Sequence, residues 1–135
     1  MKTHKILFVL TLVLTLSLAA CGSPASIPEL NGTSWSLVEI NGQPVQAGSN
    51  PTLIFDDDSA GGNGSCNSFG GDYEAKNGKL TFDGIFSTMM YCEDVMDQEF
   101  AYLGALENAA SYQVKDGMLQ ILDADGQVTL TLAPQ

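Results

Sequence analysis

Dipeptides of Asn-Gly or Asp-Gly interrupt this chain at short intervals from residue 31 onward. Both residues of such a pair tolerate positive φ angles and suit the two-residue turn of a β-hairpin. Between them lie short runs in which apolar and polar residues alternate, a period that puts the apolar side chains on one face of an antiparallel sheet. The sequence therefore predicts an antiparallel meander with one covered face. The dipeptides are Asn31-Gly32, Asn41-Gly42, Asn77-Gly78, Asp83-Gly84, Asp116-Gly117 and Asp125-Gly126, and the runs are 35–40, 52–55, 79–82, 119–121 and 128–132.

Residues 93–110 break this pattern and predict a helix. They contain no turn dipeptide, and their apolar residues follow spacings of three and four, which fall on one helical face. Carboxylates crowd the start of the segment, where they favour the positive end of the helix dipole. We expect the helix to close over the open side of the sheet. The expected buried face comprises Met96, Phe100, Leu103, Leu106 and Ala110, and the acidic start comprises Glu93, Asp94, Asp97 and Glu99.

The charge of the chain excludes several classes of function. Its 16 Asp and Glu residues outnumber five Lys and Arg residues, and the single histidine is His4. From Cys21 onward only three lysines oppose the 16 carboxylates, a net charge of -13 with neither Arg nor His. Nucleic-acid binding requires clustered basic residues, and serine or cysteine triads and His-ligated zinc require an imidazole. We therefore expect no nucleic-acid partner, no enzymatic activity or catalytic residue, and no cofactor.

Residues 1–21 have the pattern of an export signal. A basic start is followed by the apolar run 6–18, which is shorter than the ~20 residues that a spanning helix needs. The segment Leu18-Ala19-Ala20-Cys21 resembles the lipobox of bacterial lipoproteins. This resemblance implies cleavage before Cys21, a diacylglycerol on its thiol and a further acyl chain, such as palmitate, on the new amino terminus. Several acyl chains hold a protein on a bilayer almost permanently.

The chain is accordingly divided into three parts. We expect a lipoprotein signal peptide over residues 1–20, a flexible Pro- and Ser-containing tether over residues 21–30, and one folded domain over residues 31–135. The expected location is the cell envelope, on the outer membrane or the outer face of the cell membrane. The membrane, through the lipid anchor, is the first expected partner.

The two remaining cysteines form an even pair in an exported domain. Cys66 and Cys92 are 26 residues apart, and a disulfide across this interval would stabilise the fold by ~3–4 kcal/mol. A structural disulfide or a close unbonded pair is favoured over a redox pair, because the two lack the Cys-x-x-Cys arrangement of redox sites.

Both cysteines lie in segments that resemble signatures of the META domain (HslJ-type) family. Residues 65–73, Ser-Cys-Asn-Ser-Phe-Gly-Gly-Asp-Tyr, are similar to its Gly-Cys-Asn-x-Phe-x-Gly-x-Tyr motif, and residues 87–92, Ser-Thr-Met-Met-Tyr-Cys, to its Ser-Thr-x-Met-x-Cys motif. Ser65 departs from the glycine that the family often carries. The resemblance extends over about residues 30–133. The other matching positions are Asn67, Phe69, Gly71, Tyr73, Ser87, Thr88 and Met90.

The resemblance implies a fold and a setting but no reaction. It implies a mainly β fold with one helix (α+β), a small antiparallel, partly open β-barrel with the helix packed against it. Members of the family are usually envelope lipoproteins, some are associated with heat shock or with tolerance of novobiocin, and the fold is similar to that of a lipid-binding secretion pilot protein. The family has no established catalytic residues.

Two further groups of residues suggest sites. Asp56 to Gly61 partly mimics a Ca²⁺ loop, but Ala60 and Asn67 occupy positions where such a loop needs oxygen ligands, so we expect a solvated strand end and no metal site. Met89, Met90, Met96 and Met118 could line an adaptable apolar pocket, although core filling under the helix is the expected use.

These observations lead to one main functional hypothesis and several alternatives. The main hypothesis is a monomeric, non-enzymatic, lipid-anchored envelope protein that binds another envelope protein or a small apolar ligand, in stress or antibiotic tolerance. One alternative is an inhibitor of extracytoplasmic proteases that presents the segment from Ser59 to Phe69. Others are a Ca²⁺-binding envelope module and a hydrolase that uses carboxylates alone.

Overall fold

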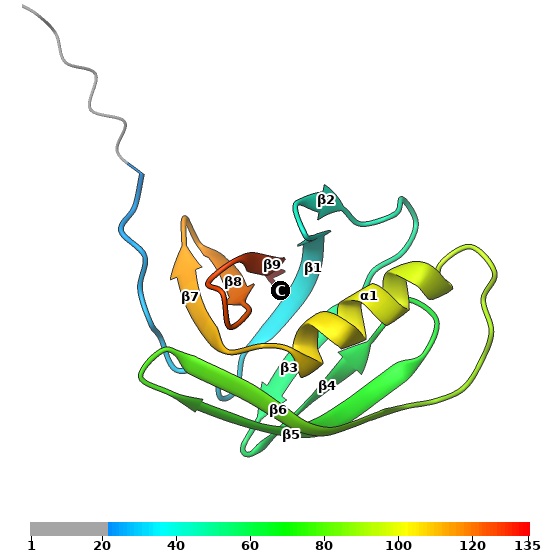
Figure 1. Cartoon of the computed structure of the whole chain (residues 1–135), viewed down its shortest axis with the longest axis horizontal. Coiled ribbons are helices and arrows are strands. Elements are labelled where there is room, and N and C mark those ends of the chain that lie inside the picture. The colour runs from blue at the N-terminus through cyan, green and yellow to red at the C-terminus, as the bar shows by residue number, and fades with distance from the viewer. Residues whose placement is uncertain (1–21) are drawn as a thin grey trace, which may run out of the picture.

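The computed structural model of the protein describes residues 22–135 (Figure 1). The predicted signal peptide and Cys21 lie outside the described residues. Within residues 22–135, none of the helical structure has the length and apolar character needed to span a bilayer.

Across the described residues 22–135, nine antiparallel strands form one sheet that curls into a ring, and there is one helix. The order is β1-β3-β4-β5-β6-β7-β8-β9, and β9 pairs with β1 to complete the ring, while the short β2 extends one edge of β1. The elements are β1 (Ser34–Ile40), β2 (Gln43–Pro44), β3 (Thr52–Asp56), β4 (Ser59–Asn63), β5 (Ser68–Lys76), β6 (Lys79–Ser87), α1 (Met96–Glu107), β7 (Ser111–Lys115), β8 (Met118–Leu122) and β9 (Val128–Pro134).

The ring is weakly paired between β6 and β7. Strands β6 and β7 pair through the single residue pair Lys79 and Ser111, whereas β7 and β8 pair along their full length. The predicted fold class, mainly β with one helix in a partly open antiparallel barrel, is therefore confirmed.

Three of the six turn dipeptides act as predicted. Asn41-Gly42, Asn77-Gly78 and Asp116-Gly117 make two-residue hairpin turns, and both residues of each have positive φ. The prediction is wrong for Asp83-Gly84, which lies inside β6, opposite an irregular register in β5. A bulge can place Gly in a strand at positive φ, so the dipeptide bends β6 instead of ending it.

The periodicity missed four strands, the two-residue β2 and the longer β4, β5 and β7. Strand β4 has the sequence Ser-Ala-Gly-Gly-Asn, which lacks the branched and aromatic residues typical of strands. Its glycines are needed because the neighbouring backbone lies so close. A Cβ atom at Gly62 would clash with the carbonyl oxygen of Thr52 on β3.

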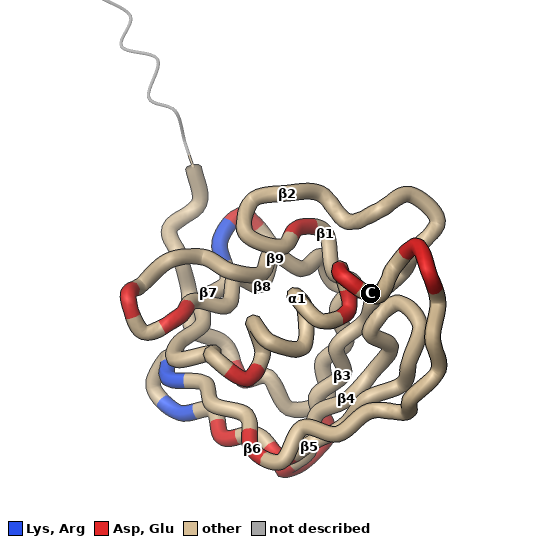
Figure 2. Tube along the Cα trace, turned by 45° about the vertical axis from the view of Figure 1, so that its right-hand side comes forward, with Lys and Arg blue, Asp and Glu red and all other residues tan. Residues whose placement is uncertain are grey.

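Helix α1 lies within the curve of the strands and fills the interior of the ring (Figures 1 and 2). Tyr102 and Leu106 are fully buried among the inward-facing side chains of the strands. The Tyr102 hydroxyl donates a hydrogen bond to the carbonyl of Thr52 (3.1 Å). One face of the helix thus completes a core that inward-facing strand side chains otherwise fill.

The predicted buried face of the helix is partly wrong. Phe100 is 64 % exposed, whereas Glu99 is only 1 % exposed. The helix is rotated so that Tyr102 faces inward and packs edge-on against Phe69 of β5, with ring centroids 5.6 Å apart. Position 99, three residues earlier, shares that inward face, and Phe100 is turned out.

The segment that the sequence predicts to be a flexible tether is attached to the ring for much of its length. Ser26 and Val114 of β7 exchange two backbone hydrogen bonds of 2.7 Å each. Pro28 accepts a hydrogen bond from the Tyr112 hydroxyl (2.8 Å), and Leu30 is buried in the core. The compact domain therefore includes residues before the predicted start at 31.

Candidate functional site

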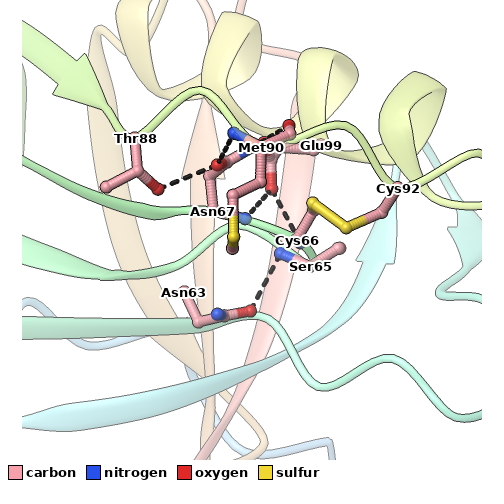
Figure 3. The surroundings of a disulfide bond; sticks show 8 residues. All are labelled: Asn63, Ser65, Cys66, Asn67, Thr88, Met90, Cys92 and Glu99. Carbon is pink, nitrogen blue, oxygen red and sulfur yellow. Dashed lines mark hydrogen bonds between the residues drawn. A yellow bond between two sulfur atoms is a disulfide. The ribbon is translucent and has the colours of Figure 1, made fainter.

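The two motif segments meet at one end of the ring, where a disulfide joins them (Figure 3). Cys66 precedes β5 and Cys92 lies in the loop between β6 and α1, and their Cα atoms are 5.8 Å apart. The disulfide fixes this loop to the β4–β5 turn.

Asn67 adds a second connection between the same segments and uses all of its side-chain hydrogen-bonding capacity. Its Nδ2 donates to the Met90 carbonyl (3.0 Å) and to Oε1 of Glu99 (2.6 Å). Its Oδ1 accepts from the Thr88 hydroxyl (2.8 Å) and from the Met90 N–H (2.7 Å). Since Asn67 is 2 % exposed, these bonds replace water completely. This motif residue holds the loop 88–90 in place.

Glu99 is the buried anion of this network, and sequence analysis assigned it only to the acidic start of the helix. Its Oε2 accepts from the backbone N–H groups of Cys66 (2.8 Å) and Asn67 (2.7 Å). Burial raises the pKa of this carboxyl, but the hydrogen bonds from Asn67 and Cys66 favour the charged form and leave the pKa below its ordinary value. The carboxylate ties α1 to the β4–β5 turn.

The other motif residues support the same region. Phe69 packs against Tyr102, and Tyr73 packs edge-on against Phe55 with centroids 4.8 Å apart. Gly71 faces β6 so closely that a Cβ would lie 2.9 Å from the carbonyl oxygen of Asp83. Each of these contacts is structural. The motif therefore builds a rigid end of the ring, and none of these contacts indicates a reaction.

Ser65, the departure from the family motif, has a φ of 132°, a region that favours glycine. Two hydrogen bonds offset the strain of this conformation. The Ser65 N–H donates to Oδ1 of Asn63 (2.9 Å), and Nε2 of Gln98 donates to the Ser65 hydroxyl (2.8 Å). Gln98 also connects α1 to the segment after β2, since its Oε1 accepts from the N–H of Gln46 (2.6 Å).

Above this network the loop and the helix expose a group of large apolar side chains, which we call the apolar surface. Its members are Met89, Met90, Tyr91 and Phe100, with exposed fractions of 97, 58, 78 and 64 %. They border a shallow hollow of about 270 Å³ whose floor includes Asn67 and Glu99. A cluster of exposed apolar side chains on a rigid support is typical of an interaction site.

The prediction that the methionines fill the core is therefore wrong for two of them. Met96 is buried at the start of α1, and Met118 is half-buried on β8. The chain leaves the sheet after Ser87, and Asn67 hydrogen-bonds to the backbone of Met90. The side chains of Met89 and Met90 therefore point outward. Exposed carboxylates of Glu93, Asp94 and Asp97 follow the apolar surface along the chain.

The other predicted sites have simple structural roles. Asp56 to Gly61 spans a β3–β4 hairpin turn in which Asp57 has positive φ. In the part of the chain that the structure describes, there is no group of three His, Cys, Asp or Glu side chains placed to hold a metal ion. The segment from Ser59 to Phe69 is not a projecting loop, since β4 and β5 occupy its ends and Cys66 and Asn67 are buried.

The ring with its internal helix and two motif segments joined by a disulfide defines the META-domain class of barrel. The chain matches the META domain family over residues 28–135 and belongs to it. It is 35 % identical over 127 residues to heat shock protein HslJ of Escherichia coli (strain K12), a match that covers 90 % of this chain and 86 % of HslJ.

Two solved structures are similar to this fold. One is the NMR structure of a protein from Burkholderia xenovorans, with 29 % identity and a TM-score of 0.65, covering 78 % of this chain and 83 % of the other. The second, also an NMR structure, has 26 % identity and a TM-score of 0.63, covering 77 % and 90 % of the two chains. The family match begins at residue 28, which agrees with the docking of residues 26–30 on the ring.

Proposed function

We propose that this protein is a lipid-anchored, non-enzymatic component of the cell envelope that binds another envelope protein through the apolar surface. The observation that carries the proposal is the exposure of Met89, Tyr91 and Phe100 on a loop and helix fixed by a disulfide and a buried carboxylate. A preorganised loop loses little entropy on binding, and aromatic residues are typical centres of protein interfaces.

The filled interior favours a protein partner over a small apolar ligand. Tyr102, Leu106 and the strand side chains occupy the space inside the ring. The hollow beneath the apolar surface, at about 270 Å³, is slightly below the ~300–1,000 Å³ range of ligand pockets.

The charge near the apolar surface indicates the chemistry of the partner. Glu93, Asp94 and Asp97 are exposed, and the domain as a whole is strongly acidic. Complementary charges speed association and suppress wrong partners. The partner segment is expected to combine apolar anchors with Lys or Arg side chains.

In this proposal Cys21 carries the lipid anchor, and the lipobox-like segment 18–21 supports attachment to the outer membrane or the outer face of the cell membrane. Likeness to a relative named as a heat shock protein supports a role under stress. Labelling with a palmitate analogue and intact-mass measurement would test the anchor. Cys21→Ser is expected to abolish labelling and membrane retention, and unchanged retention would contradict it.

Photo-crosslinking in cells would test the binding function. A photoreactive residue at Met89 is expected to capture a protein that the same residue at Ile54, an apolar side chain 44 % exposed on β3, does not capture. With that partner purified, Tyr91→Ala and Phe100→Ala should each weaken binding about tenfold or more, and the matched control Ile54→Ala should not. Equal affinity for all three variants would refute the apolar surface as the binding site.

A further inference from the structure

The N-terminal segment leaves the ring from a defined place. The Ser23 N–H donates to Oδ1 of Asp116 (3.0 Å), and Ser26 pairs with Val114 of β7. Five peptide units separate Cys21 from Ser26, a reach of at most roughly 17 Å. An acyl anchor on Cys21 therefore holds this side of the domain near the bilayer surface.

The basic residues of the folded domain gather on that side. Lys76 and Lys79 flank the β5–β6 turn, and Lys115 precedes the β7–β8 turn. The β5–β6 turn lies beside β7 and the docked segment, because the backbone N–H of Tyr112 on β7 donates to the carbonyl of Gly78 (2.9 Å) and Ile27 packs near Gly78. Lys115 directly follows Val114, the partner of Ser26. Figure 2 shows the lysines on the side from which the N-terminal segment leaves, with carboxylates spread around the whole trace. We call residues 23–29, 76–79 and 115–116 the lysine face.

Charge separates the lysine face from the rest of the domain. Glu29 and Asp116 oppose its three lysines, which leaves it near neutral, and the other carboxylates of the described residues belong to segments outside it. An anionic bilayer attracts exposed lysines and repels the remaining acidic surface. Ile27, which is 59 % exposed, adds an apolar side chain that can enter the headgroup region.

The apolar surface lies at the other end of β6. This strand runs nine residues from Lys79 to Ser87, about 26 Å, and the loop that carries Met89 follows directly. Figure 1 shows the β5–β6 turn beside the docked N-terminal segment and the loop before α1 on the opposite side of the molecule.

We propose that the lysine face lies against anionic phospholipid headgroups, so that the apolar surface points away from the membrane that anchors the protein. This inference rests on the acylation of Cys21 proposed above. Two independent features set the orientation, the short reach from Cys21 to the docked segment and the near-neutral charge of this one face. The protein then meets its partner on the side of the domain remote from its own bilayer.

Chemical footprinting of the acylated mature protein, residues 21–135, would test this orientation. Its three lysines would be labelled with a membrane-impermeant amine reagent on preformed phosphatidylcholine vesicles, with and without phosphatidylglycerol, and in non-ionic detergent. We expect labelling of Lys76, Lys79 and Lys115 about fivefold slower on anionic vesicles, equivalent to ~1 kcal/mol per lysine at an anionic surface. Carbodiimide labelling of Asp94 and Asp97 should be the same in all three states.

The possible results distinguish failure of the proposed orientation from failure of the proposed lipid anchor. An intact mass without acyl chains would remove the anchor and, with it, the proposed orientation. An acylated protein whose lysines react equally in all states, or whose Asp94 and Asp97 are the protected groups, would overturn the orientation and leave the anchor standing. Equal protection on neutral and anionic vesicles would overturn the assignment to anionic headgroups.

Discussion

Glu99 is a buried carboxylate at the centre of the hydrogen-bond network beside the disulfide. Its carboxylate accepts three hydrogen bonds of 2.6–2.8 Å from Cys66 and Asn67 while it is 1 % exposed. A buried anion with three donors holds them only while it remains charged. The order of the β4–β5 turn thus depends on one ionisation.

Replacement of Glu99 by Gln is expected to lower the free energy of unfolding by about 2–4 kcal/mol. The amide of Gln keeps one acceptor oxygen but places its NH2 group against either the backbone N–H groups of Cys66 and Asn67 or the side-chain amide of Asn67, so at least one buried donor loses its acceptor. Urea titration at neutral pH would measure the loss. A loss no larger than that of Glu107→Gln, an exposed position on the same helix, would contradict this role.

The same carboxylate predicts acid sensitivity. Because the folded pKa of Glu99 lies below its ordinary value of 4.5, its contribution is complete above that value and is lost as the pH falls through the folded pKa. Wild type should therefore lose part of its stability below about pH 4.5, and Glu99→Gln should lose less over the same range. Parallel pH profiles of the two proteins would count against the hydrogen-bonded anion.

Ser65 has a strained backbone, so one substitution at this position is expected to relieve strain. Ser65→Ala removes the hydrogen bond from Gln98 and keeps the φ of 132°, whereas Ser65→Gly removes both the bond and the strain. The Gly variant is expected to be more stable than the Ala variant by about 1 kcal/mol or more. Thermal unfolding of both would decide, and an Ala variant as stable as the Gly variant would show that the turn relaxes.

For single residues, the sequence predicted which motif residues belong to the site better than it predicted what each of them does. The motif comparison pointed to Asn67, Thr88 and Ser65, and all three belong to the network at the disulfide or beside it. Glu99 escaped because four acids near a helix start have a general explanation in the helix dipole. The signal that could have found it is its spacing from Met96 and Tyr102, which places a carboxylate on the buried face.

Among the elements, the loop between β6 and α1 depends most on its connections to neighbours. It has no regular structure between Thr88 and Cys92, and it is fixed at Thr88 and Met90 by Asn67 and at Cys92 by the disulfide. The hydrogen bonds of Asn67 and the disulfide therefore fix the backbone of the loop that carries the exposed side chains. Loss of either connection should loosen the apolar surface first.

The double variant Cys66→Ser/Cys92→Ser is expected to lower the free energy of unfolding by about 3–4 kcal/mol, since the disulfide closes a 26-residue interval. Hydrogen exchange at the Met90 N–H should accelerate more than exchange at Leu119, which lies on β8 in the core. Uniform acceleration over the whole domain would indicate that the disulfide acts on global stability alone.

The elements that the sequence could predict are those with a strong period of their own. Strand β1 and strand β9 alternate clearly, and the helix was recognised although its buried face was rotated. Strand β4 could not be found from propensity, because Gly61 and Gly62 are required by backbone contacts with β3 and β5 that no local pattern encodes. The docking of residues 26–30 on β7 is likewise a tertiary effect.

The whole molecule carries its charge unevenly, and this affects its stability. With 16 carboxylates and three lysines from Cys21 onward, like charges repel across most of the surface. Raising the salt concentration to 1 M shortens the screening length to about 3 Å and weakens this repulsion.

In 1 M NaCl the free energy of unfolding of the domain is expected to rise by about 1 kcal/mol. This corresponds to a rise in Tm of roughly 4–8 °C for a domain near this size. The double variant Glu93→Gln/Asp94→Asn, with two fewer exposed carboxylates, should gain less. A Tm that falls with added salt would show that attractive pairs outweigh the repulsion.

Closure of the ring has a consequence for the order of events in the life of the chain. Strand β1 needs β9 as its partner, with Trp35 opposite Pro134, so the first and last strands must meet before the barrel exists. Pairing between strands so distant in sequence comes late in folding. The barrel cannot close while residues 128–134 remain in the ribosome, so a nascent chain stays open until its last strand is released.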